Sequence, residues 1–135
     1  VASLFENEIE AGRVVYEGYV TDERLNELYS ETRLFVNPSS FEGFGMGAIE
    51  AIGKGIPCLL ADNSAVKEVT MGRVAYYSPA EDINTLAEAI SFALENPPSE
   101  EYLKETAKLV KQRYDYRIAA KEYLQLFEEM KKAYE

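Results

Sequence analysis

Short apolar segments alternate with longer amphipathic segments along most of this 135-residue sequence. The apolar segments have the length of strands, and the stretches between them place apolar residues at helical spacing. This alternation is typical of β–α–β units, in which helices cover the faces of a parallel sheet. We therefore expect an α/β protein with a Rossmann-like parallel sheet flanked by helices. The expected strands are residues 13–17, 34–37, 57–61 and 73–77.

Helix signals fill the intervals between these strands. Thr21 or Asp22 is expected to cap the first helix, because their side chains accept hydrogen bonds from free backbone N–H groups. Gly55 is expected as the left-handed residue that ends the helix over residues 46–54. A short helical turn is expected at residues 66–69, and longer helices from residues 82, 99 and 116. We divide residues 1–135 into a leading segment (1–12), a single partial domain and a C-terminal wrapping helix (116–135).

Charge and composition exclude several classes of function. The chain has 24 acidic and 14 basic side chains, a net charge of −10, which argues against a nucleic-acid partner. It contains no histidine, so Ser-His-Asp catalysis and histidine zinc sites are excluded, and we expect no metal site. The single cysteine, Cys58, lies in an apolar run and is expected to be a buried thiol of a cytoplasmic protein. No apolar stretch is long enough to cross a bilayer.

A loop rich in serine and glycine follows the second expected strand, at residues 38–45. In an open α/β sheet, ligands bind in the crevice beyond the carboxyl end of a strand and before the next helix. Gly43 and Gly45 permit close approach of a ligand to the backbone. The N–H groups that open the next helix form an anion pocket there without any lysine. A diphosphate is therefore compatible with this acidic chain.

Two carboxylates flank the start of that helix. Glu42 lies in the loop, and Glu50 lies about one turn inside the helix. They are spaced to accept hydrogen bonds from hydroxyls at opposite ends of one polar ligand. A hydrolytic carboxylate pair is an alternative, although the sequence fixes no distance between them. A solvated loop acid and an exposed helix residue remain the simplest interpretation of the spacing alone.

The motif around these residues resembles a known family. Residues 38–45 (Pro-Ser-Ser-Phe-Glu-Gly-Phe-Gly), followed by residues 49–51 (Ile-Glu-Ala) and 55–57 (Gly-Ile-Pro), are similar to retaining glycosyltransferases with two Rossmann-like domains. These are the GT-B enzymes of glycosyl transferases group 1, and the resemblance is to their C-terminal nucleotide-sugar-binding domain. Flanking segments agree in order, over roughly residues 13–95.

The resemblance implies a role for each site residue by motif position. Glu42 would lie by the donor sugar as the catalytic residue, and Glu50 would bind the ribose hydroxyls. The sugar and diphosphate would be bound by Gly43, Phe44, Gly45 and Met46. The nucleotide base would be bound by Gly18, Tyr19 and Val20, although Tyr19 could equally be an ordinary aromatic at a strand end. No cofactor is implied, since the nucleotide diphosphate sugar is the substrate.

Two departures from the family affect the expected activity. The strand and helix that carry basic residues facing the diphosphate do not appear before Arg13, and the acceptor domain is absent. Arg13 and Lys54 are poor substitutes by position, and Met46 and Gly47 stand where many relatives have proline. We therefore expect a domain truncated at its N-terminus and inactive in transfer when isolated. The partners are a nucleotide sugar and the missing N-terminal acceptor domain, with a homodimer and peripheral attachment of the parent enzyme to the inner membrane face as further candidates.

Two other classes of function remain open on the sequence. One is a non-catalytic nucleotide- or sugar-binding module, or an assembly module, with the same fold. The other is a related two-domain enzyme, such as a sugar epimerase or a phosphorylase. A phosphorylase would need a lysine that bears pyridoxal phosphate, and no lysine here has a convincing setting for it.

Overall fold

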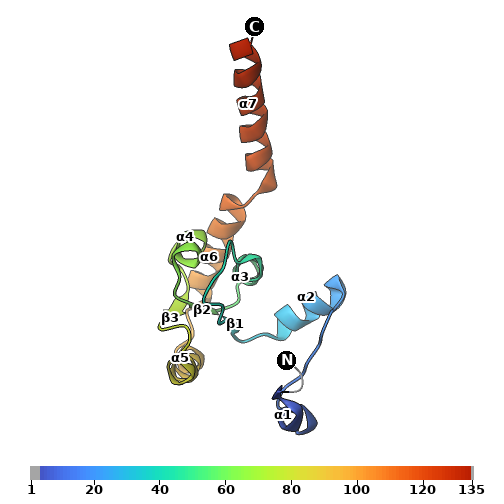
Figure 1. Cartoon of the computed structure of the whole chain (residues 1–135), viewed down its shortest axis with the longest axis vertical. Coiled ribbons are helices and arrows are strands. Elements are labelled where there is room, and N and C mark those ends of the chain that lie inside the picture. Colours follow the sequence, from blue (N-terminus) through green and yellow to red (C-terminus); the bar gives the residue numbers. More distant parts are fainter. Residues whose placement is uncertain (1–3, 135) are drawn as a thin grey trace. The chain divides into compact units, whose positions relative to one another are not determined.

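The computed structural model describes residues 4–134, so Val1, Ala2, Ser3 and Glu135 lie outside the description. The chain divides into two compact units, Val1–Glu31 and Thr32–Glu135. The second unit contains the sheet and most of the helices (Figure 1).

The second unit is built on a three-stranded parallel sheet in the order β1-β2-β3. Its strands are β1 (Phe35–Asn37), β2 (Cys58–Ala61) and β3 (Ala75–Tyr77). Val36 is paired with Leu59, and Leu60 with Tyr76. All residues of the central strand β2 are buried, as its continuous apolar run predicts. The expected parallel α/β architecture is confirmed.

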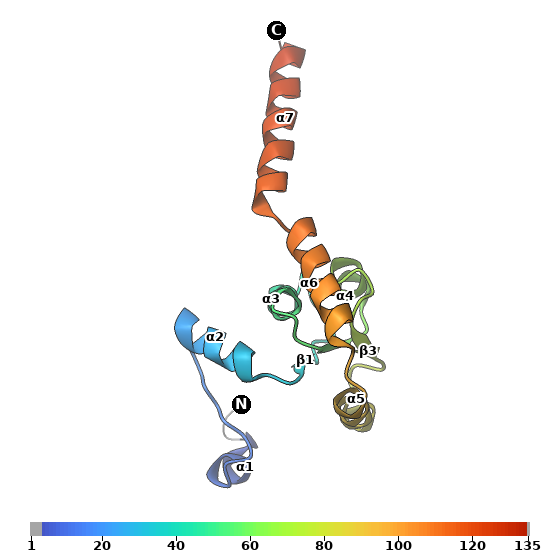
Figure 2. The same ribbon diagram turned by 180° about the vertical axis from the view of Figure 1, so that it is seen from behind.

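Helices cover both faces of this sheet. The helices described in this unit are α3 (Met46–Gly53), α4 (Ser64–Val69), α5 (Ile83–Glu95), α6 (Glu100–Arg113) and α7 (Tyr116–Tyr134), of which α7 does not cover the sheet. Helix α5 packs on one side of the sheet, whereas α3 and α6 lie on the other side and contact each other (Figures 1 and 2). The apolar stripe of α5 packs with Leu86, Ala89 and Ile90 against buried residues of β2 and β3. The stripe therefore has the core-packing role that its helical spacing predicts.

Side chains at the expected positions cap these helices. Asp82 Oδ1 accepts hydrogen bonds from the backbone N–H groups of Asn84 and Thr85 at the start of α5. Ser99 Oγ accepts one from the N–H of Tyr102 at the start of α6. Gly55 adopts φ +78° after α3, the left-handed conformation expected of it. The boundaries of α5 and α6 thus follow from local chemistry.

Cys58 is buried in the core of the second unit, at 4% exposure. Its Sγ donates to the Ile56 carbonyl oxygen over 3.3 Å, and burial raises the pKa of the thiol to about 12. A thiol with so high a pKa is not a nucleophile at neutral pH. The expectation of a buried thiol is confirmed.

The first unit contains α1 (Glu6–Glu10) and α2 (Asp22–Glu31). The prediction of a strand at residues 13–17 is wrong, because no strand forms there and Val15 is 73% exposed. Instead, the backbone N–H groups of Arg13 and Val14 donate to the Glu8 carbonyl oxygen at the end of α1. A strand requires a neighbouring strand to take up its backbone hydrogen bonds, and the described part of this unit has no second strand. Helix α1 has no counterpart among the expected helices.

Helix α7 forms where the sequence predicts the last helix, but none of its described residues is buried. Several of its large apolar side chains, including Tyr123 and Phe127, are more than half exposed. Wrapping around the domain therefore stays a prediction for this segment. No helix between residues 4 and 134 combines the length and the apolar character needed to cross a membrane.

Candidate functional site

The loop expected to bind ligand lies between β1 and α3, at the carboxyl end of β1. Gly45 is the N-cap of α3 and adopts φ +76°, a left-handed conformation that side chains other than glycine rarely accept. A Cβ added at Gly47 would lie 3.3 Å from Cζ of Phe35 on β1. The two glycines therefore let the chain turn sharply and let the helix lie close against the strand.

A chain of hydrogen bonds holds Glu42 at the mouth of this loop. Asn37 Nδ2, at the end of β1, donates to Glu42 Oε1 over 2.9 Å. Asn37 Oδ1 accepts from the backbone N–H of Ser39 over 3.1 Å. Asn63 Nδ2 donates to the Ser39 carbonyl oxygen over 3.4 Å, while Asn63 Oδ1 caps α4 through the N–H of Val66. One oxygen of Glu42 is thus bonded to Asn37 at the end of β1, and Asn63, after β2, holds the loop itself at Ser39.

The start of α3 presents backbone donors beside Glu42. The N–H groups of Ala48 and Ile49 both donate to the Gly45 carbonyl oxygen, over 3.0 and 3.2 Å. Met46 and Gly47 come before the first residues whose N–H groups donate within the helix. N–H groups at these positions have no partner inside an α-helix. Together with the helix dipole they give this end of α3 a partial positive charge. The arrangement can bind an anion such as a phosphate without a basic side chain.

Phe44 in the same loop is held from the end of α6. Its ring meets the Tyr114 ring edge-on, with centroids 5.3 Å apart and an interplanar angle of 81°. The Tyr114 hydroxyl donates to the Val69 carbonyl oxygen over 2.7 Å, which fixes the ring that Phe44 contacts. The loop is therefore supported on one side by Asn37 and on the other by Tyr114.

Glu50 is exposed on α3. It borders an open hollow of about 420 Å³, together with Ile49 and Lys111 and with the Tyr114 ring that contacts Phe44. A carboxylate at such a place can accept hydrogen bonds from the hydroxyls of a polar ligand. Glu42 thus precedes the N-terminus of α3 in the chain, and Glu50 lies within the helix.

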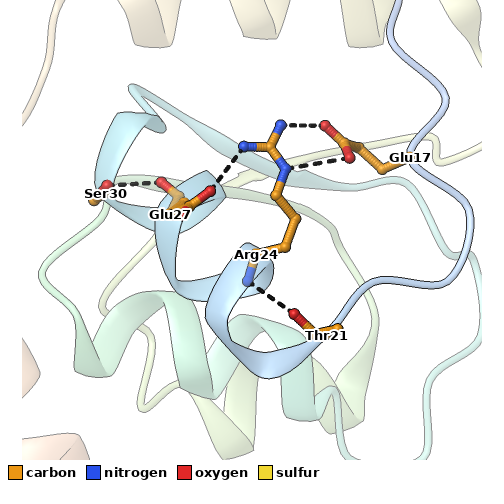
Figure 3. A network of polar contacts seen from close by, with 5 residues as sticks. All are labelled: Glu17, Thr21, Arg24, Glu27 and Ser30. Carbon is orange, nitrogen blue, oxygen red and sulfur yellow. Dashed lines mark hydrogen bonds and ion pairs between the residues drawn. The ribbon is translucent and has the colours of Figure 1, made fainter.

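The residues expected to bind the base, Gly18, Tyr19 and Val20, belong to the first unit. Gly18 adopts φ +63°, and the Tyr19 side chain is fully exposed. A polar network brackets the three residues, because Arg24 on α2 contacts both Glu17 before them and Thr21 after them (Figure 3). Thr21 Oγ1 accepts from the Arg24 backbone N–H over 3.3 Å, as expected of an N-cap. An exposed ring on a short bracketed segment is suited to stacking on a planar group.

The same network sets the protonation of Glu17. Hydrogen bonds donated by the Arg24 guanidinium lower the pKa of Glu17, and their acceptance by the carboxylates of Glu17 and Glu27 raises the pKa of Arg24. Glu27 accepts from Arg24 Nη1 over 3.2 Å, and the Ser30 hydroxyl donates to the Glu27 carbonyl oxygen over 2.7 Å (Figure 3). The Arg24–Glu17 pair therefore stays ionised well below neutral pH.

The structure gathers Glu42, Gly43, Phe44, Gly45 and Met46 into one continuous loop and helix start, with Glu50 further along α3. Sequence reasoning missed the residues that support this loop. Asn37 carried a signal, since asparagine at a strand end before proline often accepts from a nearby backbone N–H. Tyr114 carried none, because its contact with Phe44 joins segments far apart in the chain. Residues 4–134 contain no cluster of three or more Cys, Asp or Glu side chains placed to hold a metal ion.

Comparison with known proteins gives consistent matches. Residues 4–110 match the family described as glycosyl transferases group 1. O-antigen chain mannosyltransferase B of Escherichia coli is 33% identical over 93 residues, which cover 69% of this chain and 24% of the relative. The putative glycosyltransferase EpsF of Bacillus subtilis (strain 168) is 36% identical over 88 residues, or 64% of this chain and 23% of the relative.

A solved structure shares the fold. Sucrose-phosphate synthase from Thermosynechococcus elongatus superposes with a TM-score of 0.81 at 26% identity, covering 97% of this chain and 33% of that one. The expected GT-B Rossmann-like architecture is thereby confirmed. The chain spans about a quarter of the length of the two curated relatives above.

Proposed function

Because the chain belongs to the glycosyl transferases group 1 family, we propose that it is the donor-binding part of a retaining glycosyltransferase. The whole enzyme transfers a sugar from a nucleotide diphosphate sugar to an acceptor. The observation that supports this best is the loop after β1, where the tethered carboxylate of Glu42 stands beside the N-terminus of α3. A carboxylate and an anion-binding helix end suit the two halves of a sugar diphosphate.

The diphosphate is bound by backbone groups in this proposal. Gly43, Phe44, Gly45 and Met46 lead into α3, whose first N–H groups are available to phosphate oxygens. Such donors carry no formal charge, which is consistent with a chain of net charge −10. Lys54 is the C-cap of α3, at the opposite end of the helix, so it is a poor candidate for this contact.

Glu42 is the proposed catalytic residue beside the donor sugar. The hydrogen bond from Asn37 occupies one of its oxygens, so the carboxylate is oriented before the substrate arrives. In the retaining reaction that we propose, the leaving diphosphate assists the acceptor's attack on the same face of the sugar. No separate general base is then required from this chain.

Glu50 binds the ribose hydroxyls in this proposal, and Gly18, Tyr19 and Val20 bind the base. The exposure of Glu50 beside an open hollow supports its role. The fully exposed Tyr19 ring, on a segment bracketed by Arg24, is suited to contact a planar base. These assignments rest on motif positions, and each can be tested by substitution.

We also propose that the 135-residue chain by itself does not transfer sugar. The matched region covers only about a quarter of each of the two relatives above, and in this proposal the acceptor-binding elements belong to the remainder. The isolated chain would then bind the donor only weakly. The parent enzyme is proposed to be cytoplasmic, and its acceptor domain is the partner that this chain requires. Donor-dependent transfer by the isolated chain would contradict this proposal.

Calorimetry and NMR titration of the 135-residue chain test donor binding. The ligands are UDP, GDP, UDP-glucose and GDP-mannose, the last because one relative is a mannosyltransferase. We expect amide shifts across residues 43–50 with at least one nucleotide. Glu50→Ala should weaken that binding about tenfold or more, because a charge-assisted hydrogen bond is lost.

Glu88→Ala is the matched control, since Glu88 is an exposed acid on α5 with no role in the proposed site. It removes one negative charge, as Glu50→Ala does, and should leave binding unchanged. If Glu50→Ala weakens binding no more than Glu88→Ala does, the ribose role is wrong. If no nucleotide shifts residues 43–50 at millimolar concentration, a non-catalytic assembly module becomes the better description.

A further inference from the structure

An open hollow of about 520 Å³ lies between the C-terminal end of α3 and one face of α6, and it reaches the start of α7. Five of the ten residues that line this basic hollow are basic, and one is acidic. They are Lys54, Lys104, Lys108, Lys111 and Arg117, with Asp115 as the acid. In a chain with a net charge of −10, these residues give the hollow a local charge of +4. We infer that it binds a small molecule that carries a phosphate or diphosphate group.

Three of the lysines form a row along α6. Lys104, Lys108 and Lys111 are spaced by four and then three residues, so they are neighbours on one face of the helix. Like charges at this spacing repel each other and destabilise a helix. Lys104 is paired with Glu100 over 3.1 Å, but Lys108 and Lys111 form no ion pair with any residue between 4 and 134. An anion bound among them would supply the missing negative charge.

The other walls leave room and donors for such a ligand. Gly53 and Gly55 line the side formed by the end of α3, and they bring no side chain into the hollow. Arg117 is paired with Asp115, but its side chain is 72% exposed. The bonds of that pair use Nε and Nη2, which leaves the Nη1 donors to a ligand. A phosphate oxygen can therefore accept from a guanidinium as well as from ammonium groups.

Acidic side chains beside the lysine row limit the size of the ligand. Glu100, Glu101 and Glu105 line the adjoining surface of α6 together with Lys104 and Lys108. The positive surface is therefore narrow, and the net charge of −10 opposes an extended anion. At physiological salt, exposed charges interact over only about 8 Å, so a small anion in the hollow interacts mainly with the basic residues. These charges favour a compact phosphate or diphosphate over a nucleic acid or an anionic membrane.

The basic hollow and the proposed donor site use different parts of α3. Lys54 is the C-cap of the helix, whereas the proposed diphosphate contacts of the donor begin at its N-cap, Gly45. Lys54 and Lys111 also border the hollow beside Glu50. A ligand in the basic hollow would therefore lie next to the proposed ribose contact without using the N–H groups that open α3.

Inorganic diphosphate is the first probe. In an NMR titration of the 135-residue chain at constant ionic strength, we expect saturable shifts at the amides of Gly55, Lys108 and Gln112. Lys108→Met and Lys111→Met should each weaken binding about two- to fivefold, as expected of exposed charges. The double variant should weaken it about tenfold. Methionine keeps the helix propensity of lysine, and circular dichroism checks that each variant folds.

Lys132→Met is the matched control. Lys132 is an exposed lysine on α7 that does not line the basic hollow. The substitution removes the same charge as Lys111→Met and should leave the affinity for diphosphate unchanged. A difference between these two variants therefore reports on position and not on net charge.

Vesicles of phosphatidylglycerol and phosphatidylcholine are the second probe, because a lipid headgroup presents the same phosphate chemistry on an extended surface. We expect the wild type and the double variant to sediment with them to the same extent. Sedimentation that the Lys108 and Lys111 substitutions abolish would assign the basic hollow to a membrane surface instead.

Three results would overturn the inference. They are the absence of saturable shifts at the three amides, equal losses of affinity in Lys111→Met and Lys132→Met, and vesicle binding that depends on Lys108 and Lys111. The nucleotide titration has separate reporters at residues 43–50. Failure at the basic hollow therefore leaves the proposed donor site standing, and failure at the donor site leaves the basic hollow standing.

Discussion

Helices α3 and α7 are held in opposite ways. Helix α3 is short and contains glycine at Gly47 and Gly53, yet Ala48, Ile49, Ala51 and Ile52 are all buried. Helix α7 has 19 residues and a marked apolar stripe, but none of its described residues is buried. A helix with poor intrinsic propensity can therefore be firmly packed, and a helix with a long apolar stripe can lack buried residues. The helix that opens the candidate site depends on packing, whereas α7 depends on local interactions.

Removing a large side chain should produce the largest difference between the two helices. Ile52 on α3 is 3% exposed, so Ile52→Ala should lower the free energy of unfolding by about 2–5 kcal/mol. Ile118 on α7 is 46% exposed, and Ile118→Ala should cost less than about 1 kcal/mol. Urea titrations followed by circular dichroism measure both. Equal losses would mean that α7 packs in solution as firmly as α3.

Replacing the two glycines of α3 should produce a smaller effect. Gly53 does not have a positive φ, and a Cβ there would lie 3.8 Å from Lys111 Cε, an ordinary contact. Gly53→Ala should therefore raise the free energy of unfolding by about 0.5–1 kcal/mol. At Gly47 the same change places Cβ 3.3 Å from Phe35, and strain offsets the gain in helix propensity. Gly47→Ala should therefore be about 1 kcal/mol less stable than Gly53→Ala. Thermal melts compare the two, and the reverse order would show that Phe35 yields without cost.

The smallest change in stability is expected at the start of α7, where Asp115 and Arg117 form an exposed ion pair and no described residue of the helix is buried. Side-chain and backbone hydrogen bonds from Arg117 lower the pKa of Asp115 to about 2, from an ordinary 3.8. Because the folded-state pKa is depressed, this stabilisation is present above about pH 4 and is lost as the pH falls through 2. NMR titration of the Asp115 carboxyl should give a midpoint near 2.

Arg117→Met checks the assigned cause. Without the guanidinium, the midpoint of Asp115 should move up toward 3.8, although the remaining backbone hydrogen bond keeps it somewhat below that value. The accompanying loss of stability should be close to the limit of measurement, because the pair is exposed and screened by solvent. A midpoint that does not move would show that another group sets the pKa.

Local chemistry explains which parts of this molecule were predictable. The caps at Asp82 and Ser99, the left-handed Gly55 and the buried run of β2 all follow from residues close together in the chain. The strand expected at residues 13–17 failed because an apolar pattern specifies a strand only where another strand can pair with it. The apolar pattern alone does not indicate whether such a partner is present.

The support of the candidate site was less predictable for a similar reason. Glu42 and the glycines after it could be named from their motif, but the bond from Asn37 depends on the path of the intervening loop. The contact between Phe44 and Tyr114 joins β1's loop to the end of α6, and no periodicity reports such a distant pair. An apolar cavity beside Thr106 likewise forms only when β2, β3, α3, α5 and α6 are assembled.

Tyr114 has a consequence for motion. Its ring touches Phe44 in the candidate loop, and its hydroxyl holds the Val69 carbonyl oxygen at the end of α4. Two segments that are separate in the chain therefore share one fixed point, so their fluctuations should be correlated. Helix α7 begins just after this tyrosine, at Tyr116, which places the base of a long exposed helix next to that shared point. We therefore expect a tilt of α7 to be transmitted through Tyr114 to the loop that carries Glu42.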